Sequence, residues 1–210
     1  MTDDRGTPSD LADAPNLPHE VRTGSSRAFD GKLLRVRVDQ VRLPSGRESV
    51  REIVEHQGSV VIVPVTVDDE VIMIRHFRHA TGRTLLELPA GLIDPGEEIL
   101  ETARRELLEE TGYVAETLRH LTNVYVSPGY SEERTSIVLA ERCVATHHEP
   151  DQDEPMQILA RPLAAIPSLL LPGETAIENA QAMLGLLWLL RLQATDDPMP
   201  PRSGQSAGAW

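Results

Sequence analysis

The chain is poor in cysteine and in aromatic residues, and it has no long apolar run. Its single cysteine, Cys143, excludes an intrachain disulfide, and we expect a small core residue near the end of a strand rather than a catalytic thiol. Aromatic residues make up only 3% of the 210 positions, so the core must be mainly aliphatic. No apolar run reaches the roughly eighteen residues of a membrane-spanning helix, and no basic segment leads into an apolar one, so we expect a cytoplasmic protein with no membrane partner.

Positive charge is also scarce. Lys and Arg number 20 against 33 Asp and Glu, which gives a formal net charge of −13. Nucleic acids and anionic membranes both require a positive protein surface, so we expect neither as the main partner. A phosphorylated small molecule is compatible with this charge, because metal ions can bridge acidic side chains to phosphate.

Residues 94–112 predict a turn, an acidic helix and a stop. Asp94-Pro95-Gly96 is a turn sequence, and two glutamates follow it where the positive end of a helix dipole favours negative charge. Good helix formers continue to Glu110, over about three to four turns. Gly112 stands where a left-handed C-terminal cap is needed.

The spacing along this helix places three carboxylates beside its buried face. At about 100° per residue, the apolar stripe consists of Ile99, Leu100, Ala103 and Leu107. Glu106, Glu109 and Glu110 crowd one edge of that stripe. A buried, unpaired carboxylate is costly, and a divalent cation such as Mg²⁺ or Mn²⁺, which prefers clustered oxygen ligands, would remove that cost. The alternative is a solvated acidic face with Arg104 and Arg105 as ion-pair partners.

The complete spacing resembles the signature box of the Nudix hydrolases: Gly, five residues, Glu, seven residues, then Arg-Glu-Leu-x-Glu-Glu-x-Gly. Its eight fixed positions are all present, at Gly91, Glu97, Arg105, Glu106, Leu107, Glu109, Glu110 and Gly112. The last position of the box, usually a branched aliphatic residue, is Tyr113, a packing change that leaves the acidic residues in place. Eight residues at fixed spacing make this pattern far more specific than a lone acidic helix face.

The pattern of strands and helices around the box indicates an α/β protein. Apolar runs predict strands at residues 32–43, 48–56, 59–66, 71–77, 84–88, 118–126, 135–141 and 156–160. A short helix is expected within 162–171, and an apolar amphipathic helix over 174–192. Mixed strands with helices between and after them predict a layered domain. The Nudix resemblance, which covers about residues 25–192, implies an α/β/α sandwich around a mixed sheet.

We expect four segments along the chain. They are a disordered tail at 1–24, an N-terminal β-sheet region at 25–57, the Nudix domain at 58–193 and a second disordered tail at 194–210. The hairpin predicted at 32–56 is marginally stable by itself, so it must pack on something else.

The family resemblance implies hydrolysis of a diphosphate linkage in a nucleoside diphosphate joined to another group. The metal ligands that it implies are Glu106, Glu109, Glu110 and the backbone carbonyl of Ala90. The resemblance also implies a catalytic role for Arg105. Together with Glu97, this arginine is expected to orient the acidic cluster. The expected cofactor is Mg²⁺, with Mn²⁺ as a substitute.

Three features outside the box resemble the ADP-ribose pyrophosphatase branch of that family. They are Glu87-Leu-Pro-Ala-Gly91 leading into the box, Pro128 fifteen residues beyond Tyr113, and the hairpin at 32–56. The branch implies Mg²⁺-dependent hydrolysis of ADP-ribose to AMP and ribose 5-phosphate, by a homodimer that exchanges this hairpin between its subunits. Another sugar nucleotide such as GDP-mannose, or a dinucleotide, is an alternative substrate. A non-catalytic ligand sensor is an alternative of a different class.

The branch also implies site residues beyond the metal ligands. Its catalytic base lies in the loop that holds Glu132 and Glu133, and Glu133, just before Arg134, fits that position better. The residues expected to contact the nucleoside diphosphate sugar are Arg51, Arg78, Glu87, Pro128 and Gly129, with Arg51 reaching the site of the partner subunit. A structural interpretation competes with each: strand-edge charges for the arginines, internal support for the glutamate and a turn for the Pro-Gly pair.

Overall fold

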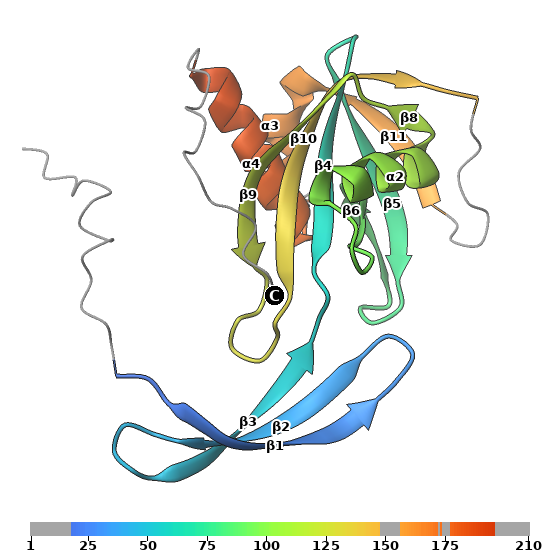
Figure 1. Ribbon diagram of the computed structural model, residues 1–210. Coiled ribbons are helices and arrows are strands. Elements are labelled where there is room, and N and C mark those ends of the chain that lie inside the picture. The colour runs from blue at the N-terminus through green and yellow to red at the C-terminus, as the bar shows by residue number, and fades with distance from the viewer. Residues whose placement is uncertain (1–17, 148–155, 172, 174–176, 196–210) are drawn as a thin grey trace, which may run out of the picture. The chain divides into compact units, whose positions relative to one another are not determined.

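The computed structural model describes residues 18–147, 156–171, 173 and 177–195, and it divides into two compact units, Met1–Glu55 and His56–Trp210 (Figure 1). Each unit has its own β-sheet, and the helix of the signature box lies in the second unit. Most of the two predicted tails, at 1–24 and 194–210, lies outside the described residues.

The first unit is a three-stranded antiparallel sheet in the order β1-β2-β3. Strands β2 (Arg35–Arg42) and β3 (Glu48–Glu55) form the predicted hairpin, and Gly46 in the turn between them has a φ of 83°, which favours glycine. The sequence pattern does not predict β1 (Val21–Asp30), whose first four residues belong to the expected tail. This strand contains Gly-Ser-Ser, which has weak strand propensity, so its pairing along β2 decides its conformation.

Polar contacts, more than apolar packing, connect the strands of this first sheet. Val41 is the only buried apolar side chain among its described residues. Buried Asp39 accepts hydrogen bonds from the Ser25 hydroxyl (2.6 Å) and from Arg37 Nε (3.0 Å), and these donors, the serine first, hold the pKa of its carboxyl below the usual range. Large apolar side chains stay exposed on the unit, at Val21, Phe29, Leu33, Leu34 and Val50. Such a sheet needs further burial to be stable.

The second unit is built on an eight-stranded mixed sheet. Its central order is β11-β5-β4-β10-β8, with β6 pairing β5, β7 pairing β4 and β9 pairing β10. The strands are β4 (Ser59–Thr66), β5 (Glu70–Arg78), β6 (Arg83–Glu87), β7 (Ala90–Leu92), β8 (Tyr113–Val114), β9 (Thr117–Tyr125), β10 (Arg134–Ala145) and β11 (Met156–Pro162). β4 and β10 run parallel, with Ser59 opposite Thr135, and the remaining pairs are antiparallel.

Helices cover both faces of this mixed sheet, as the predicted α/β/α sandwich requires. One face carries α2 (Ile99–Thr111), and the other carries α4 (Ala180–Ala194) near the short helices η1 (Leu163–Ala165) and α3 (Ile166–Leu169) (Figure 1). Successive side chains of β4 point to opposite faces of the sheet. Val60 and Ile62 lie in one core cluster with α2, and Val61 and Val63 lie in the other with α4. The buried members of both clusters are aliphatic or sulfur-containing, as the low aromatic content predicts.

The structure corrects several predicted boundaries. β10 continues to Ala145 instead of ending at 141, and the three-residue β7 is not predicted at all. α4 begins at Ala180 because the Asn179 side chain accepts a hydrogen bond from the Ala182 N–H (2.9 Å) and caps the helix there, whereas residues 174–176 lie outside the described residues. Leu100, expected in the buried stripe of α2, is 39% exposed, because it lies at the outermost edge of that stripe.

Cys143 is fully buried on β10, in the core cluster under α2. Burial raises the pKa of its thiol to about 12. The thiol is therefore protonated at neutral pH, and the structure agrees with the expected role of a small core residue. In the part of the chain that the structure describes, no helix has both the length and the hydropathy needed to span a bilayer.

Leu107→Ala should lower the free energy of unfolding by about 2–5 kcal/mol, because it leaves a cavity between α2 and the sheet. Leu100→Ala is the matched control on the exposed side of the same helix and should cost less than about 1 kcal/mol. Urea unfolding followed by circular dichroism measures both. Equal losses would contradict the orientation of α2.

Candidate active site

Capping interactions hold the acidic helix α2 at both ends. Glu98 is its N-cap and forms a capping box with Glu101. Gly112 follows the helix in the left-handed conformation, with a φ of 71°, and donates its N–H to the Leu108 carbonyl (2.8 Å). The helix therefore begins and ends close to the positions that the sequence predicts.

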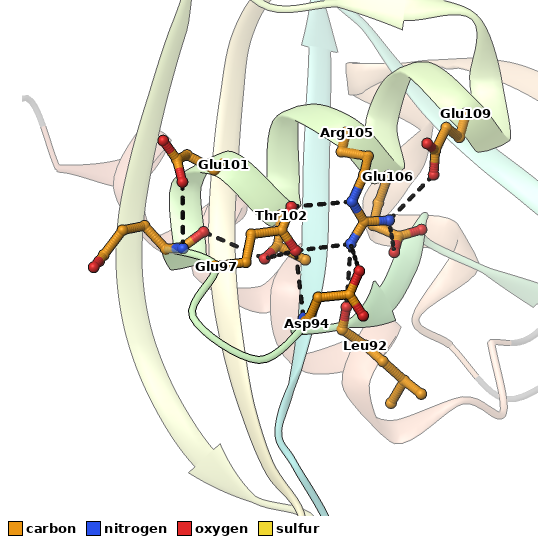
Figure 2. Close-up of polar contacts among 9 residues, drawn as sticks. Leu92, Asp94, Glu97, Glu101, Thr102, Arg105, Glu106 and Glu109 are labelled. Atoms are coloured by element: carbon orange, nitrogen blue, oxygen red, sulfur yellow. Dashed lines mark hydrogen bonds and ion pairs between the residues drawn. The ribbon is translucent and has the colours of Figure 1, made fainter. Parts of the chain in front are cut away.

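Arg105 is the centre of the polar network beside this helix (Figure 2). Its Nε and Nη2 donate to the two carboxylate oxygens of Glu97, at 3.0 and 2.9 Å. Its Nη1 donates to Glu106 Oε1 (2.7 Å) and Glu109 Oε2 (3.1 Å), and its Nη2 also donates to the Leu92 carbonyl (3.3 Å). One guanidinium thus binds three of the four glutamates at fixed positions of the box and sets their relative positions.

The two glutamates closest to Arg105 differ in their electrostatics. Arg105, and then the Thr102 hydroxyl at 2.8 Å, lower the pKa of Glu97 to about 2. Only 13% of the Glu106 side chain is exposed, and burial raises the pKa of this carboxyl although the same arginine acts against the shift. Glu97 is therefore a permanent anion that anchors Arg105, whereas Glu106 is a desolvated carboxylate that a further positive charge would stabilise.

Strand β7 brings its backbone against the carboxylates of α2. It pairs with β4, with Ala90 opposite Val61. The Ala90 N–H donates a hydrogen bond to Glu110 Oε2 (2.9 Å). A Cβ on Gly91 would lie 2.0 Å from Glu106 Cδ, so any other residue here would force this carboxylate to move. The glycine of the box therefore allows the Glu106 carboxylate to lie where the structure places it.

The carboxylates of Glu106, Glu109 and Glu110 fit a divalent cation by their chemistry and by their spacing on one edge of α2. Within the described residues, however, no three acidic, histidine or cysteine side chains are gathered closely enough to hold a metal ion. Oxygens of Glu106 and Glu109 face Arg105, and one oxygen of Glu110 faces the Ala90 N–H. The donor set suits a cation, and the carboxylates would have to rotate to gather around it.

A second cluster joins two of the predicted substrate contacts to each other. Glu87, on β6, is 2% exposed. Arg78, on β5, donates to it through Nη2 (2.7 Å) and Nε (3.2 Å). The Arg78 side chain is 42% exposed, so the buried carboxylate neutralises an arginine that solvent can reach. The ion pair is neutral as a whole and gives Glu87 the internal structural role that competes with its predicted contact to the substrate. The substrate-binding roles of Arg78 and Glu87 stay predictions.

The loop between β9 and β10 carries Pro128, Gly129, Glu132 and Glu133. Backbone and side-chain bonds fold it at the Glu133 end: the Val126 N–H donates to the Glu133 carbonyl (3.2 Å), and the Glu133 N–H donates to Ser131 Oγ (3.1 Å). The Glu133 carboxylate is partly buried and accepts a hydrogen bond from Gln181 Nε2 (3.1 Å), whereas Glu132 is exposed.

Sequence reasoning did not single out Gln181. The apolar pattern assigned nearly all of the helix at 174–192 to core packing, although a glutamine in the first turn of such an apolar helix is an available signal. The tertiary fold brings this residue to Glu133, 48 positions earlier in the chain.

Arg51 lies in the first unit, on β3. Its guanidinium binds the Glu20 carboxylate, with Nε 2.9 Å and Nη2 2.5 Å from the two oxygens, and its Nη1 donates to Ser49 Oγ (3.2 Å). These contacts belong to the N-terminal sheet, and the role of Arg51 in substrate binding stays a prediction.

Comparisons with known proteins identify the class of this protein. Residues 55–181 match the family model of the NUDIX domain, and residues 20–54 match that of the nucleoside diphosphate sugar hydrolase N-terminal domain. The chain belongs to the NUDIX family and is a hydrolase. Hydrolases of this family generally depend on a divalent metal, which agrees with the carboxylate edge of α2.

Individual relatives agree with this assignment. The ADP-ribose pyrophosphatase of Bacillus subtilis (strain 168) is 40% identical over 142 residues, which cover 67% of this chain and 77% of that protein. The ADP-ribose pyrophosphatase of Mycobacterium tuberculosis (strain ATCC 25618 / H37Rv) is 39% identical over 177 residues, or 80% and 83% of the two chains. The crystal structure of an ADP compounds hydrolase has a TM-score of 0.76 at 29% identity and covers 85% of this chain and 97% of that one. These matches confirm the resemblance and the predicted fold class.

Gly91→Ala should weaken the binding of Mn²⁺ at least about tenfold, because the new Cβ would occupy the position of the Glu106 carboxylate. Gly173→Ala is the matched control, since a Cβ there meets no atom within 4 Å. Isothermal titration calorimetry of each variant with Mn²⁺ measures the effect. Wild-type affinity in Gly91→Ala would show that Mn²⁺ binding does not need the Glu106 carboxylate at the position that it has in this structure.

Proposed function

We propose that this protein is an Mg²⁺-dependent hydrolase that cleaves ADP-ribose to AMP and ribose 5-phosphate. The observation that carries the proposal is the Glu106 carboxylate, which lies over Gly91 and is held there by Arg105 within a complete signature box. Two relatives named ADP-ribose pyrophosphatase, at 40% and 39% identity, support the choice of substrate. So does the match of residues 20–54 to the N-terminal domain of nucleoside diphosphate sugar hydrolases.

In this proposal the metal ligands are Glu106, Glu109, Glu110 and the carbonyl of Ala90. When bound, Mg²⁺ supplies charge for the diphosphate and lowers the pKa of a bound water. Arg105, anchored by Glu97, holds Glu106 and Glu109 on one edge of α2, and their carboxylates would turn from it to bind the cation. The desolvated carboxylate of Glu106 would be stabilised by the charge of the cation.

Other residues bind the substrate and move the proton. Arg78, backed by buried Glu87, offers an exposed guanidinium to phosphate or ribose. Pro128 and Gly129 shape the loop beside the substrate, and Glu133 in the same loop takes the proton of the attacking water. The water oxygen bonds to one phosphorus of the diphosphate, and the bond from that phosphorus to the bridging oxygen breaks. The products are AMP and ribose 5-phosphate.

A homodimer is part of the proposal. The N-terminal sheet has one buried apolar side chain and exposes Val21, Phe29, Leu33, Leu34 and Val50, which a second copy would cover. Exchange of the β2–β3 hairpin between subunits would also bring Arg51 toward the site of the partner.

Product analysis with Mg²⁺ tests the reaction and the substrate. The panel is ADP-ribose, GDP-mannose, UDP-glucose, NADH and a diadenosine polyphosphate. We expect AMP and ribose 5-phosphate, formed fastest from ADP-ribose. Faster cleavage of another compound would keep the hydrolytic site and reject ADP-ribose as the substrate. No turnover of any compound, with metal bound, would favour a ligand sensor.

Glu106→Gln should reduce kcat/KM for ADP-ribose about 10²–10³-fold or more, because the cation loses a charged ligand. Glu101→Gln is the control, an exposed glutamate of the same helix whose replacement can still cap the N-terminus. Steady-state kinetics and circular dichroism follow activity and fold. Full activity of Glu106→Gln would contradict the assignment of Glu106 as a metal ligand.

Glu133→Gln should lower kcat about 10²–10⁴-fold with a smaller change in KM, as expected for a general base. Glu132→Gln, the neighbouring and more exposed residue, should stay near wild type. If both variants keep full activity, neither is the base.

Size-exclusion chromatography with multi-angle light scattering should give twice the 23.2 kDa mass of one chain. Replacing exposed Val50 by Lys should shift the protein toward monomer, because a charge is costly to bury in an apolar interface. Lysine at the exposed position 67 of the second unit is the control. A monomeric wild type at micromolar concentration would refute the dimer.

A further inference from the structure

A cavity of about 340 Å³ lies in the second unit, at the opposite end of β4 from the signature box. Thr66, the last residue of β4, lines this cavity, whereas Gly91 of the box pairs with Val60 near the start of the strand. Leu189 and Leu192 of α4 form part of its wall, so it lies on the face of the sheet that α4 covers and α2 does not. None of the residues that line it belongs to the proposed hydrolytic site.

A β-bulge shapes the sheet beside this cavity. Strands β4 and β10 run parallel, and the register between them shifts by one residue between Ala140 and Cys143 of β10. Within the bulge Arg142, which lines the cavity, has a φ of 56°, a left-handed conformation that is uncommon for arginine. Bulges occur often beside functional sites, where they redirect side chains.

The wall offers one hydrogen-bond donor beside one acceptor. Arg119, on β9, and Glu141, on β10, both line the cavity. The Nε atom of Arg119 is buried, and no hydrogen-bond acceptor lies near it among the described residues. Glu141 Oε2 is 3.9 Å away, a distance that allows an ion pair but is too long for a hydrogen bond. A buried donor without an acceptor is costly, so a bound group that accepts from Nε would stabilise this arrangement.

The remaining wall favours a neutral, flat ligand. The charged residues of the wall are two of each sign, namely Asp69, Arg119, Glu141 and Arg142. A ligand with a net charge therefore gains little from them as a group. Aliphatic side chains, including Leu139 and Leu163, make up most of the rest and suit the face of a ring. An adjacent donor and acceptor suit a ring edge with an amino group beside a ring nitrogen, as in adenine.

We propose that this cavity binds an amino-substituted purine as its nucleoside, at a site separate from the hydrolytic one. Arg119 Nε donates to a ring nitrogen, Glu141 accepts from the neighbouring amino group, and the leucines cover a face of the ring. The volume lies within the range of small-molecule sites in proteins. This inference depends neither on the substrate nor on the catalytic residues proposed above.

Isothermal titration calorimetry of the full chain with adenosine tests the proposal, and we expect saturable binding. Purine riboside lacks the amino group that donates to Glu141, so it should bind at least about tenfold more weakly. AMP should bind no more tightly than adenosine at this site, because the wall has no excess of positive charge. Equal affinity for purine riboside and adenosine would contradict the role of Glu141, and tighter binding of AMP would contradict a neutral ligand.

Arg119→Met should weaken adenosine binding at least about tenfold, because it removes the donor and keeps an apolar stem of similar length. Arg191→Met, the same change at an exposed arginine of α4 outside the cavity, is the matched control and should keep wild-type affinity. Glu141→Met removes the acceptor and should also weaken binding, so the test does not depend on one variant. Circular dichroism checks the fold of each.

No binding of adenosine by the wild type at millimolar concentration would overturn the inference. Wild-type affinity in a folded Arg119→Met or Glu141→Met variant would overturn it as well. Arg78→Ala should leave adenosine binding unchanged, and loss of binding in this variant would assign the nucleoside to the hydrolytic site instead. None of these measurements requires turnover of ADP-ribose, so failure of the proposed function would leave them unaffected.

Discussion

The close approach of the Glu106 carboxylate to the backbone of Gly91 is the constraint on which the rest of the site depends. It requires α2 to lie against β7, and the buried contacts of Ala103 and Leu107 with the sheet hold the helix at that distance. Arg105 then binds the carboxylates from the exposed side. The Arg105 guanidinium offsets part of the desolvation that raises the pKa of Glu106 in this position.

The two units of the chain reach stability in different ways. The mixed sheet of the second unit is covered on both faces, and its central strand β4 is buried along nearly its whole length. The N-terminal sheet has a single buried apolar side chain, and a charged residue, Asp39, takes an interior position with its own donors. The box helix α2 packs on the covered mixed sheet, whereas the N-terminal sheet leaves Val21, Phe29, Leu33, Leu34 and Val50 exposed.

Local pattern predicts the elements that are governed by local physics. The continuous β-branched run of β4 and the capped, periodic sequence of α2 lead to boundaries close to the observed ones. β1 and β7 have no such signal, because the first has residues of weak strand propensity and the second has only three residues, and both are strands through their pairing partners. Leu100 shows the same limit of local pattern on a helix. Periodicity places it at the edge of the apolar stripe of α2, and only tertiary packing decides whether its side chain is buried or exposed.

The sequence by itself determined the chemistry of this protein: eight residues at fixed spacing put three carboxylates and an arginine on one edge of one helix, because helical geometry converts spacing into position. The tertiary structure alone decided what those carboxylates face. Glu110 meets the backbone of Ala90, Glu106 lies over Gly91, and Gln181 reaches Glu133 across 48 positions of the chain. These contacts join strands and helices that are distant in sequence, and the packing of the two faces of one sheet determines them.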